Sequence, residues 1–86
     1  LQPDQRFALW SDHVRVYEAV FEPLTDRFAR IALDALRLGP GTRCLDVAAG
    51  SGGAALMAAR TGAEVVAIDA AEGMAARIAE RACAAK

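Results

Sequence analysis

The sequence has 86 residues, enough for one small domain at most; 55% are hydrophobic, 24% are charged, and the net charge is −1. This apolar fraction is too high for a disordered chain, and without a basic surplus no nucleic-acid partner is expected. The apolar runs are far shorter than the roughly 20 residues that a membrane-spanning helix requires, so no membrane span is expected.

Two helices are predicted in the N-terminal part of the chain. The first runs roughly from Asp4 to Phe21, with a break near residues 11–12. Its apolar residues recur at helical spacing: Trp10, Val14, Tyr17, Phe21 and Leu24. Pro23 is expected to interrupt this helix, because proline cannot donate a hydrogen bond to the preceding turn.

The second predicted helix runs from Leu24 or Thr25 to Leu38. It carries an apolar stripe: Phe28, Ile31, Ala32, Ala35 and Leu36. The Gly39-Pro40-Gly41 segment is expected to stop it, with Gly39 in the left-handed position that follows many helices.

Beyond this stop, short apolar segments alternate with helical ones. Residues 43–48 and 64–69 are predicted strands, and residues 54–60 and 71–85 are predicted helices. This order of elements predicts a βαβ unit whose two strands are parallel.

The glycine-rich loop Gly50-Ser51-Gly52-Gly53 follows the first strand, and Asp69 ends the second strand nineteen residues after Gly50. At the carboxyl ends of parallel strands, backbone N–H groups point toward a ligand, and glycine lets the backbone approach it closely. An acidic residue at the end of the second strand suits the two hydroxyls of a ribose. The alternative is a structural turn in which Asp69 caps the last helix.

Two classes of nucleotide ligand fit this loop. Gly50, Gly52 and Ala55 satisfy the loose dinucleotide pattern G-x-G-x-x-G/A, which predicts an NAD(P)-dependent oxidoreductase as one alternative. Asp46 points elsewhere, because dinucleotide domains usually have an apolar residue there and a buried carboxylate requires a polar partner or ligand.

The same residues resemble the class I S-adenosylmethionine-dependent methyltransferases, most closely the small-molecule enzymes of ubiquinone and menaquinone biosynthesis. Residues 45–52, LDVAAGSG, are similar to the first motif of that family, and residues 65–74, VVAIDAAEGM, to the second. Residues 39–43 resemble the common lead-in to the first strand. The chain departs from the family at Ala48, where a glycine is usual, and at Ala71, where serine is common.

This resemblance implies an α/β fold: a Rossmann-like, doubly wound parallel sheet, with only its first two strands present and N-terminal helices before them. Residues 1–38 would form a helical lid or support segment, and residues 39–86 the truncated first half of the cofactor domain. The catalytic residues would lie after Lys86 and stay unknown. Both strands would keep an open edge, so an edge-paired or swapped oligomer is expected.

The resemblance also implies S-adenosyl-L-methionine as the cofactor. Its binding residues would be Tyr17, Asp46, Ala48, Gly50, Gly52, Asp69, Ala70 and Met74. Asp46 would hold the methionine end and Asp69 the ribose hydroxyls, while Ala70 and Met74 would flank the adenine. Tyr17 would be a lid residue, although its place in an apolar stripe also fits core packing.

The implied function is methyl transfer to a small-molecule acceptor in the cytoplasm. A non-catalytic interaction module that keeps the fold is the other alternative. Cys44, Cys83 and His13 lie too far apart in the sequence for a metal motif, so no metal is expected. Two cysteines make no disulfide framework in so short a chain, which favours a reducing cytosol with Cys44 as an inert buried thiol.

Overall fold

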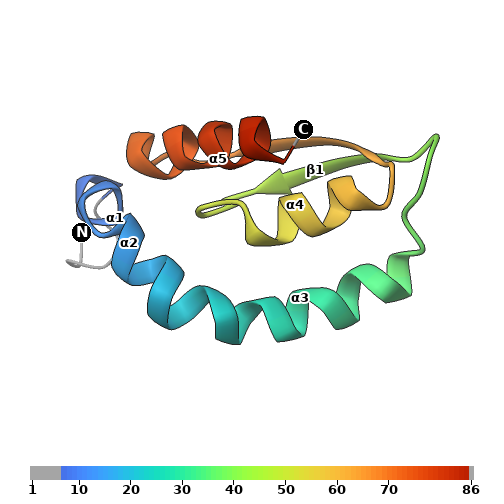
Figure 1. Cartoon of the computed structure of the whole chain (residues 1–86), viewed down its shortest axis with the longest axis horizontal. Helices are drawn as coiled ribbons and strands as arrows, with labels where there is room; N and C mark the ends of the chain where they lie inside the picture. The colour runs from blue at the N-terminus through green and yellow to red at the C-terminus, as the bar shows by residue number, and fades with distance from the viewer. Residues whose placement is uncertain (1–6, 86) are drawn as a thin grey trace.

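The computed structural model describes residues 7–85, which are α/β (Figure 1). The N-terminal part contains α1 (Phe7–Asp12), α2 (Val14–Val16), the π-helical turn η2 (Tyr17–Phe21) and α3 (Glu22–Leu36). It is followed by β1 (Arg43–Val47), α4 (Gly53–Arg60), β2 (Glu64–Ile68) and α5 (Glu72–Ala84). The predicted order of strands and helices from residue 43 onward is confirmed, whereas the predicted helix start at Asp4 lies outside the described residues.

Pro23 does not interrupt the helix, contrary to the prediction from sequence. It lies at the second residue of α3, directly after a π-helical turn. In that turn, the N–H of Glu22 donates to the carbonyl of Tyr17, five residues earlier. The backbone therefore stays helical from Val14 to Leu36, and the predicted break falls at His13, between α1 and α2.

The end of α3 also differs from the prediction. The helix stops at Leu36, and Arg37 takes the left-handed conformation, with φ 53°, that was expected of Gly39. Gly39 instead belongs to the turn that leads into β1. Its N–H donates to Oγ1 of Thr42 at 2.7 Å, and the N–H of Thr42 donates back to the carbonyl of Gly39 at 3.0 Å.

Strands β1 and β2 pair in parallel, with Arg43 opposite Glu64 and Val47 opposite Ile68. Exposure alternates along both strands, as expected for a sheet with one covered face. Helix α4 packs against both strands. The uncovered face consists of Leu45, Val47, Val66 and Ile68, whose exposed fractions lie between 49% and 64%. We call these four residues the open sheet face.

The buried apolar cluster of the described residues lies between the N-terminal helices and α5. Val14, Ala71 and Met74 form it, and Trp10 and Tyr17 pack against it. Helix α1 crosses one end of α5, which fixes the N-terminal segment beside the carboxyl ends of the strands (Figure 1).

Helix α3 runs alongside α4 (Figure 1). Its buried and half-buried residues are Glu22, Asp26, Ala29 and Leu33. The predicted apolar stripe of this helix lies outside the core, because Phe28 is 69% and Ile31 71% exposed. Glu22, at the start of the same helix, is only 6% exposed. Charged contacts therefore contribute to the docking of this helix, which an apolar periodicity cannot predict.

Candidate functional site

A cavity of about 410 Å³ opens where the loops after β1 and β2 meet the N-terminal helices. It is lined by Trp10, Tyr17, Ala48, Gly50, Asp69, Ala70, Ala71 and Met74. This position, outside the carboxyl ends of parallel strands, is where α/β sheets bind ligands. The sequence-based candidates Asp46 and Gly52 are not among the lining residues, whereas Tyr17, Ala48, Gly50, Asp69, Ala70 and Met74 are.

Asp69 connects the loops on the two sides of the cavity. Its Oδ2 accepts a hydrogen bond from the N–H of Gly50 at 2.8 Å, and its Oδ1 accepts one from the N–H of Ala71 at 2.9 Å. The N-cap residue of α5 is Ala71 and not Asp69. Each carboxylate oxygen keeps a second acceptor site, so the side chain can still receive hydroxyl groups from a ligand.

The loop after β1 uses its own N–H groups to hold its shape. The N–H of Ala49 donates to the carbonyl of Ile68 at 2.9 Å, and the N–H of Gly52 donates to the carbonyl of Ala49 at 3.2 Å. Ala48 and Gly50 have φ angles of 57° and 63°. Ala48 thus has a left-handed backbone, which glycine adopts with less strain. This conformation accounts for glycine being usual at that position in the family the sequence resembles.

Asp46 lies on β1, one residue before the strand ends, and its side chain is partly buried. Its Oδ2 is a buried oxygen for which residues 7–85 supply no hydrogen-bond partner. Burial, followed by repulsion from the nearby Asp69, raises the pKa of this carboxyl above its ordinary value. An unpaired acceptor of this kind is stabilised by a donor, which a bound ligand can supply.

Gly52 faces the protein interior. A Cβ atom at this position would lie 3.1 Å from Cγ1 of Ile78, and the φ angle of Gly52 is 98°. Packing against α5 and a left-handed backbone therefore both require glycine here. A side chain at this position would meet α5 first, which differs from the direct approach to a ligand that the sequence suggested.

Tyr17 covers Gly50 from the side of the N-terminal helices. A Cβ atom at Gly50 would lie 3.0 Å from the Tyr17 hydroxyl, and the rings of Trp10 and Tyr17 meet edge to face at a centroid distance of 6.0 Å. Burial, and secondarily three nearby carboxylates, raise the pKa of Tyr17, although a hydrogen bond with Thr25 lowers it in part. The phenol stays neutral and able to donate, and Tyr17 serves both the apolar cluster and the cavity wall.

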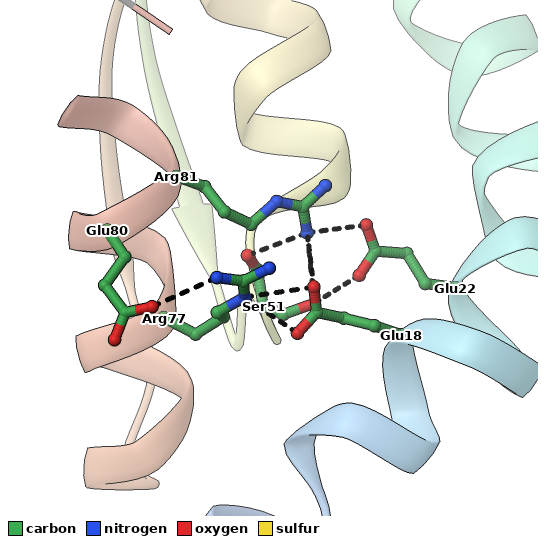
Figure 2. A network of polar contacts seen from close by, with 6 residues as sticks. All are labelled: Glu18, Glu22, Ser51, Arg77, Glu80 and Arg81. Carbon is green, nitrogen blue, oxygen red and sulfur yellow. Dashed lines mark hydrogen bonds and ion pairs between the residues drawn. The ribbon is translucent and has the colours of Figure 1, made fainter. Parts of the chain in front are cut away.

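A polar network that the sequence analysis did not identify joins the N-terminal helices to α5 and the glycine loop (Figure 2). Arg77 Nε lies 2.9 Å from Glu18 Oε2, and Arg81 Nη1 lies 2.7 Å from Glu22 Oε1. Each pair of like charges is spaced by four residues, so each lies on one side of its helix. The equal spacing of the two acidic residues on one helix and the two basic residues on another could have predicted these ion pairs from the sequence.

Ser51 sits at the centre of this network and is fully buried. Its hydroxyl donates to Glu22 Oε2, and its carbonyl accepts from Arg81 Nη1 at 3.1 Å. Glu22 also approaches the start of α4, together with Asp26. A Cβ atom on Gly53 would lie 2.7 Å from Glu22 Oε1 and 2.6 Å from Asp26 Oδ1. The protein's own carboxylates thus face the positive end of this helix.

Residues 7–85 contain no group of three or more histidine, cysteine, aspartate or glutamate side chains arranged to hold a metal ion. Within the same range, no helix has both the length and the hydropathy to cross a membrane. Cys44 and Cys83 are free thiols; Cys44 is half-buried and Cys83 exposed.

The chain is similar to several proteins of known sequence. It is 38% identical over 77 residues to a demethylmenaquinone methyltransferase of Renibacterium salmoninarum. The aligned region covers 85% of this chain and 32% of that protein. It is 45% identical over 64 residues to uncharacterized proteins of Mycobacterium tuberculosis and Mycobacterium bovis, covering 72% of this chain and 22% of theirs. The chain thus spans less than a third of the length of these relatives. No protein-family profile and no solved structure matches it.

Proposed function

We propose that this chain supplies the cofactor-binding half of an enzyme that transfers a methyl group from S-adenosyl-L-methionine to a small-molecule acceptor. The observation that carries the proposal is the pair of carboxylates near the carboxyl ends of the two paired strands. Asp69 lines the cavity; Asp46 does not line it, but has a buried oxygen without a partner among the described residues. The named relative in Renibacterium supports the same reaction class.

The charges around the cavity favour a cationic ligand over a phosphate. Among the lining residues, Asp69 is the charged one, and Asp46 lies close enough for repulsion from Asp69 to affect its pKa. A sulfonium and an amino group are attracted to such a site, whereas a pyrophosphate is repelled. This electrostatic preference supports S-adenosylmethionine over a dinucleotide, the two ligand classes that the sequence pattern left open.

The backbone N–H groups and the helix start that would bind a phosphate in a dinucleotide site face partners within the protein. The N–H of Gly50 is occupied by Asp69, and that of Gly52 by Ala49. The first residue of α4, Gly53, faces Glu22 and Asp26, where a dinucleotide domain places its pyrophosphate. These contacts argue against NAD(P) as the ligand.

Asp46 and the cavity residues would hold different parts of S-adenosylmethionine. The free oxygen of Asp46 suits the amino group of the methionine end, and the remaining acceptor sites of Asp69 suit the ribose hydroxyls. Ala70 and the buried Met74 offer apolar surface for the adenine. The cofactor would supply the activated methyl group, and the protein would contribute orientation and exclusion of water, with Tyr17 closing the cavity.

The proposal includes a Rossmann-like sheet and a cytoplasmic location. The parallel β1–β2 pair with its ligand cavity is consistent with the first two strands of such a sheet. The open sheet face is consistent with further elements packing there in the whole enzyme. Two free thiols are consistent with a reducing compartment.

Titration calorimetry of the purified protein with S-adenosylmethionine and, separately, with NADH tests this function. We expect binding of S-adenosylmethionine only, weakened by Asp46→Asn. NADH binding in its place would overturn the proposal. Release of S-adenosylhomocysteine in the presence of a demethylated quinol, the acceptor class suggested by the named relative, separates an enzyme from a non-catalytic module that keeps the fold.

A further inference from the structure

Glu22 ties the N-terminal helices to the rest of the molecule. Its side chain is nearly buried, and its two oxygens accept from different elements (Figure 2). Oε2 accepts from the hydroxyl of Ser51 in the glycine loop, and Oε1 accepts from Arg81 of α5 at 2.7 Å. A buried charge is stable only while such partners hold it. The position of Glu22 is therefore tightly coupled to both elements.

Glu22 is also coupled to the lid residue Tyr17. The N–H of Glu22 donates to the carbonyl of Tyr17, so the π-helical turn links the two residues directly. Tyr17 in turn covers Gly50, the residue beside Ser51. The ion pair between Glu18 and Arg77 of α5 holds the same turn, at 2.9 Å. A displacement of Glu22 from Ser51 and Arg81 would thus move Tyr17 off the cavity.

We propose that Glu22, held by Ser51 and Arg81, is a positioning residue that keeps Tyr17 closed over the cavity, so that a ligand enters and leaves when this buried contact opens. The identity of the ligand rests on the function proposed above, whereas the coupling between Glu22 and Tyr17 rests on the geometry alone. The two claims are therefore tested by separate measurements.

Trp10 reports the lid position without any ligand. It is the single tryptophan of the sequence, it lines the cavity, and its ring packs on Tyr17. Glu22→Gln keeps the size of the side chain and removes its charge, so we expect acrylamide to quench Trp10 fluorescence more strongly in this variant. Glu64→Gln is the matched control, because it breaks an exposed ion pair with Arg43 on the sheet. Equal quenching in wild type and a folded Glu22→Gln variant would overturn the proposal.

Stopped-flow measurements with S-adenosylhomocysteine test the effect on ligand exchange. We expect Glu22→Gln to raise the dissociation rate about tenfold, the scale of one charge-assisted hydrogen bond, and Glu64→Gln to leave it unchanged. In a Tyr17→Ala background, Glu22→Gln should add little, because the lid it positions is gone. Fully additive effects would show that Glu22 acts on stability alone, and would refute a positioning role.

The proposal stays testable if Glu22→Gln does not fold or if the wild-type protein binds neither ligand. If Glu22→Gln has no cooperative melting transition, Ser51→Ala takes its place, since it removes one of the two donors and leaves both charges. If the wild-type protein does not bind S-adenosylhomocysteine or S-adenosylmethionine, the proposed function fails, and the Trp10 quenching alone decides whether Glu22 holds the lid.

Discussion

The Oδ2 atom of Asp69 lies 2.8 Å from the backbone nitrogen of Gly50, a hydrogen bond between residues nineteen positions apart. The carboxylate suited to ribose hydroxyls therefore also fixes the loop that forms the opposite side of the cavity. Both roles are compatible, because each oxygen accepts one backbone N–H and keeps a second acceptor site. Substitutions at Asp69 are therefore expected to change both the stability of the loop and the affinity for the ligand.

Asp69→Ala is expected to weaken S-adenosylmethionine binding by about 2–3 kcal/mol, because two hydroxyls lose a charged acceptor. It should also lower the free energy of unfolding by about 1–3 kcal/mol, since the N–H groups of Gly50 and Ala71 lose their partner. Calorimetry and urea unfolding measure the two effects separately. Asp69→Asn, which keeps one carbonyl acceptor, should lose less of each. An unchanged dissociation constant in folded Asp69→Ala would assign this residue a structural role only.

Asp46→Asn is expected to separate stability from binding. The substitution removes a buried charge that has no partner among the described residues, so the free protein should gain about 0.5–2 kcal/mol of stability. Ligand affinity should fall, because the amino group of the ligand loses an anionic acceptor. Thermal melting and calorimetry on the same samples check both effects. A variant that is less stable and binds as well as wild type would contradict the role given to Asp46.

The pH dependence of stability offers a further test of Asp46. Burial first, and repulsion from Asp69 second, raise its pKa in the folded state above the ordinary value of 3.8. Between these two pKa values the folded protein binds a proton that the unfolded chain does not, so stability is lost as the pH rises through the raised pKa. The melting temperatures of wild type and Asp46→Asn should therefore diverge as the pH rises from below 3.8. A constant difference across this range would show that Asp46 does not titrate as inferred.

Gly52→Val is expected to act mainly on stability. The new side chain would meet Ile78, and the left-handed φ of 98° disfavours a branched residue. Backbone strain and overpacking each contribute about 1–3 kcal/mol. Urea unfolding of Gly52→Val and of the control Gly41→Val separates the two terms, because Gly41 has a φ of 89° and open space around it. Equal losses in both variants would show that packing against Ile78 contributes nothing.

The chain of residues 1–86 is expected to self-associate. Leu45, Val47, Val66 and Ile68 expose an apolar surface, and within residues 7–85 each strand has one free edge. Size-exclusion chromatography with light scattering should show species larger than 9.0 kDa. Val66→Lys, on the open sheet face, should reduce the association, whereas Arg37→Lys on the surface should not. A cooperative 9.0 kDa monomer would contradict this expectation.

The order of elements around the cavity was predictable because it is encoded locally. Glycines mark the turns, apolar runs mark the strands, and Asp69 follows the second run directly. The N-terminal half was less predictable, since its outcome depends on distant contacts. Glu22 is buried only because Ser51 and Arg81, 29 and 59 residues further along, supply donors. The stripe of α3 looks like a core face in sequence, yet the helix is docked through Glu22, Asp26, Ala29 and Leu33, and the stripe stays exposed.

The predictions of a helix break at Pro23 and of a helix stop at Gly39 were wrong for a different reason. Both rules that were applied, proline as a helix breaker and glycine as a helix stop, describe average preferences. Pro23 is tolerated because the turn before it is π-helical, and the helix stops at Arg37 although a glycine follows two residues later. The residue at which α3 ends depends on the path that the chain takes into the turn before β1. A short stretch of sequence does not specify that path.

The π-helical turn amounts to one additional residue in an otherwise α-helical segment. In an uninterrupted α-helix, residues five apart point in directions that differ by about 140°, so Tyr17 and Glu22 would not face the same side. The wider turn brings the two into line, one toward the cavity and one toward Ser51. Deleting a single exposed residue such as Ala19 would leave them four apart on a regular α-helix, about 40° from each other and so still on the same side. Single-residue deletions in this turn should therefore preserve the contacts of Tyr17 and Glu22 better than deletions within a regular α-helical stretch, where a lost residue rotates the preceding side chains by about 100°.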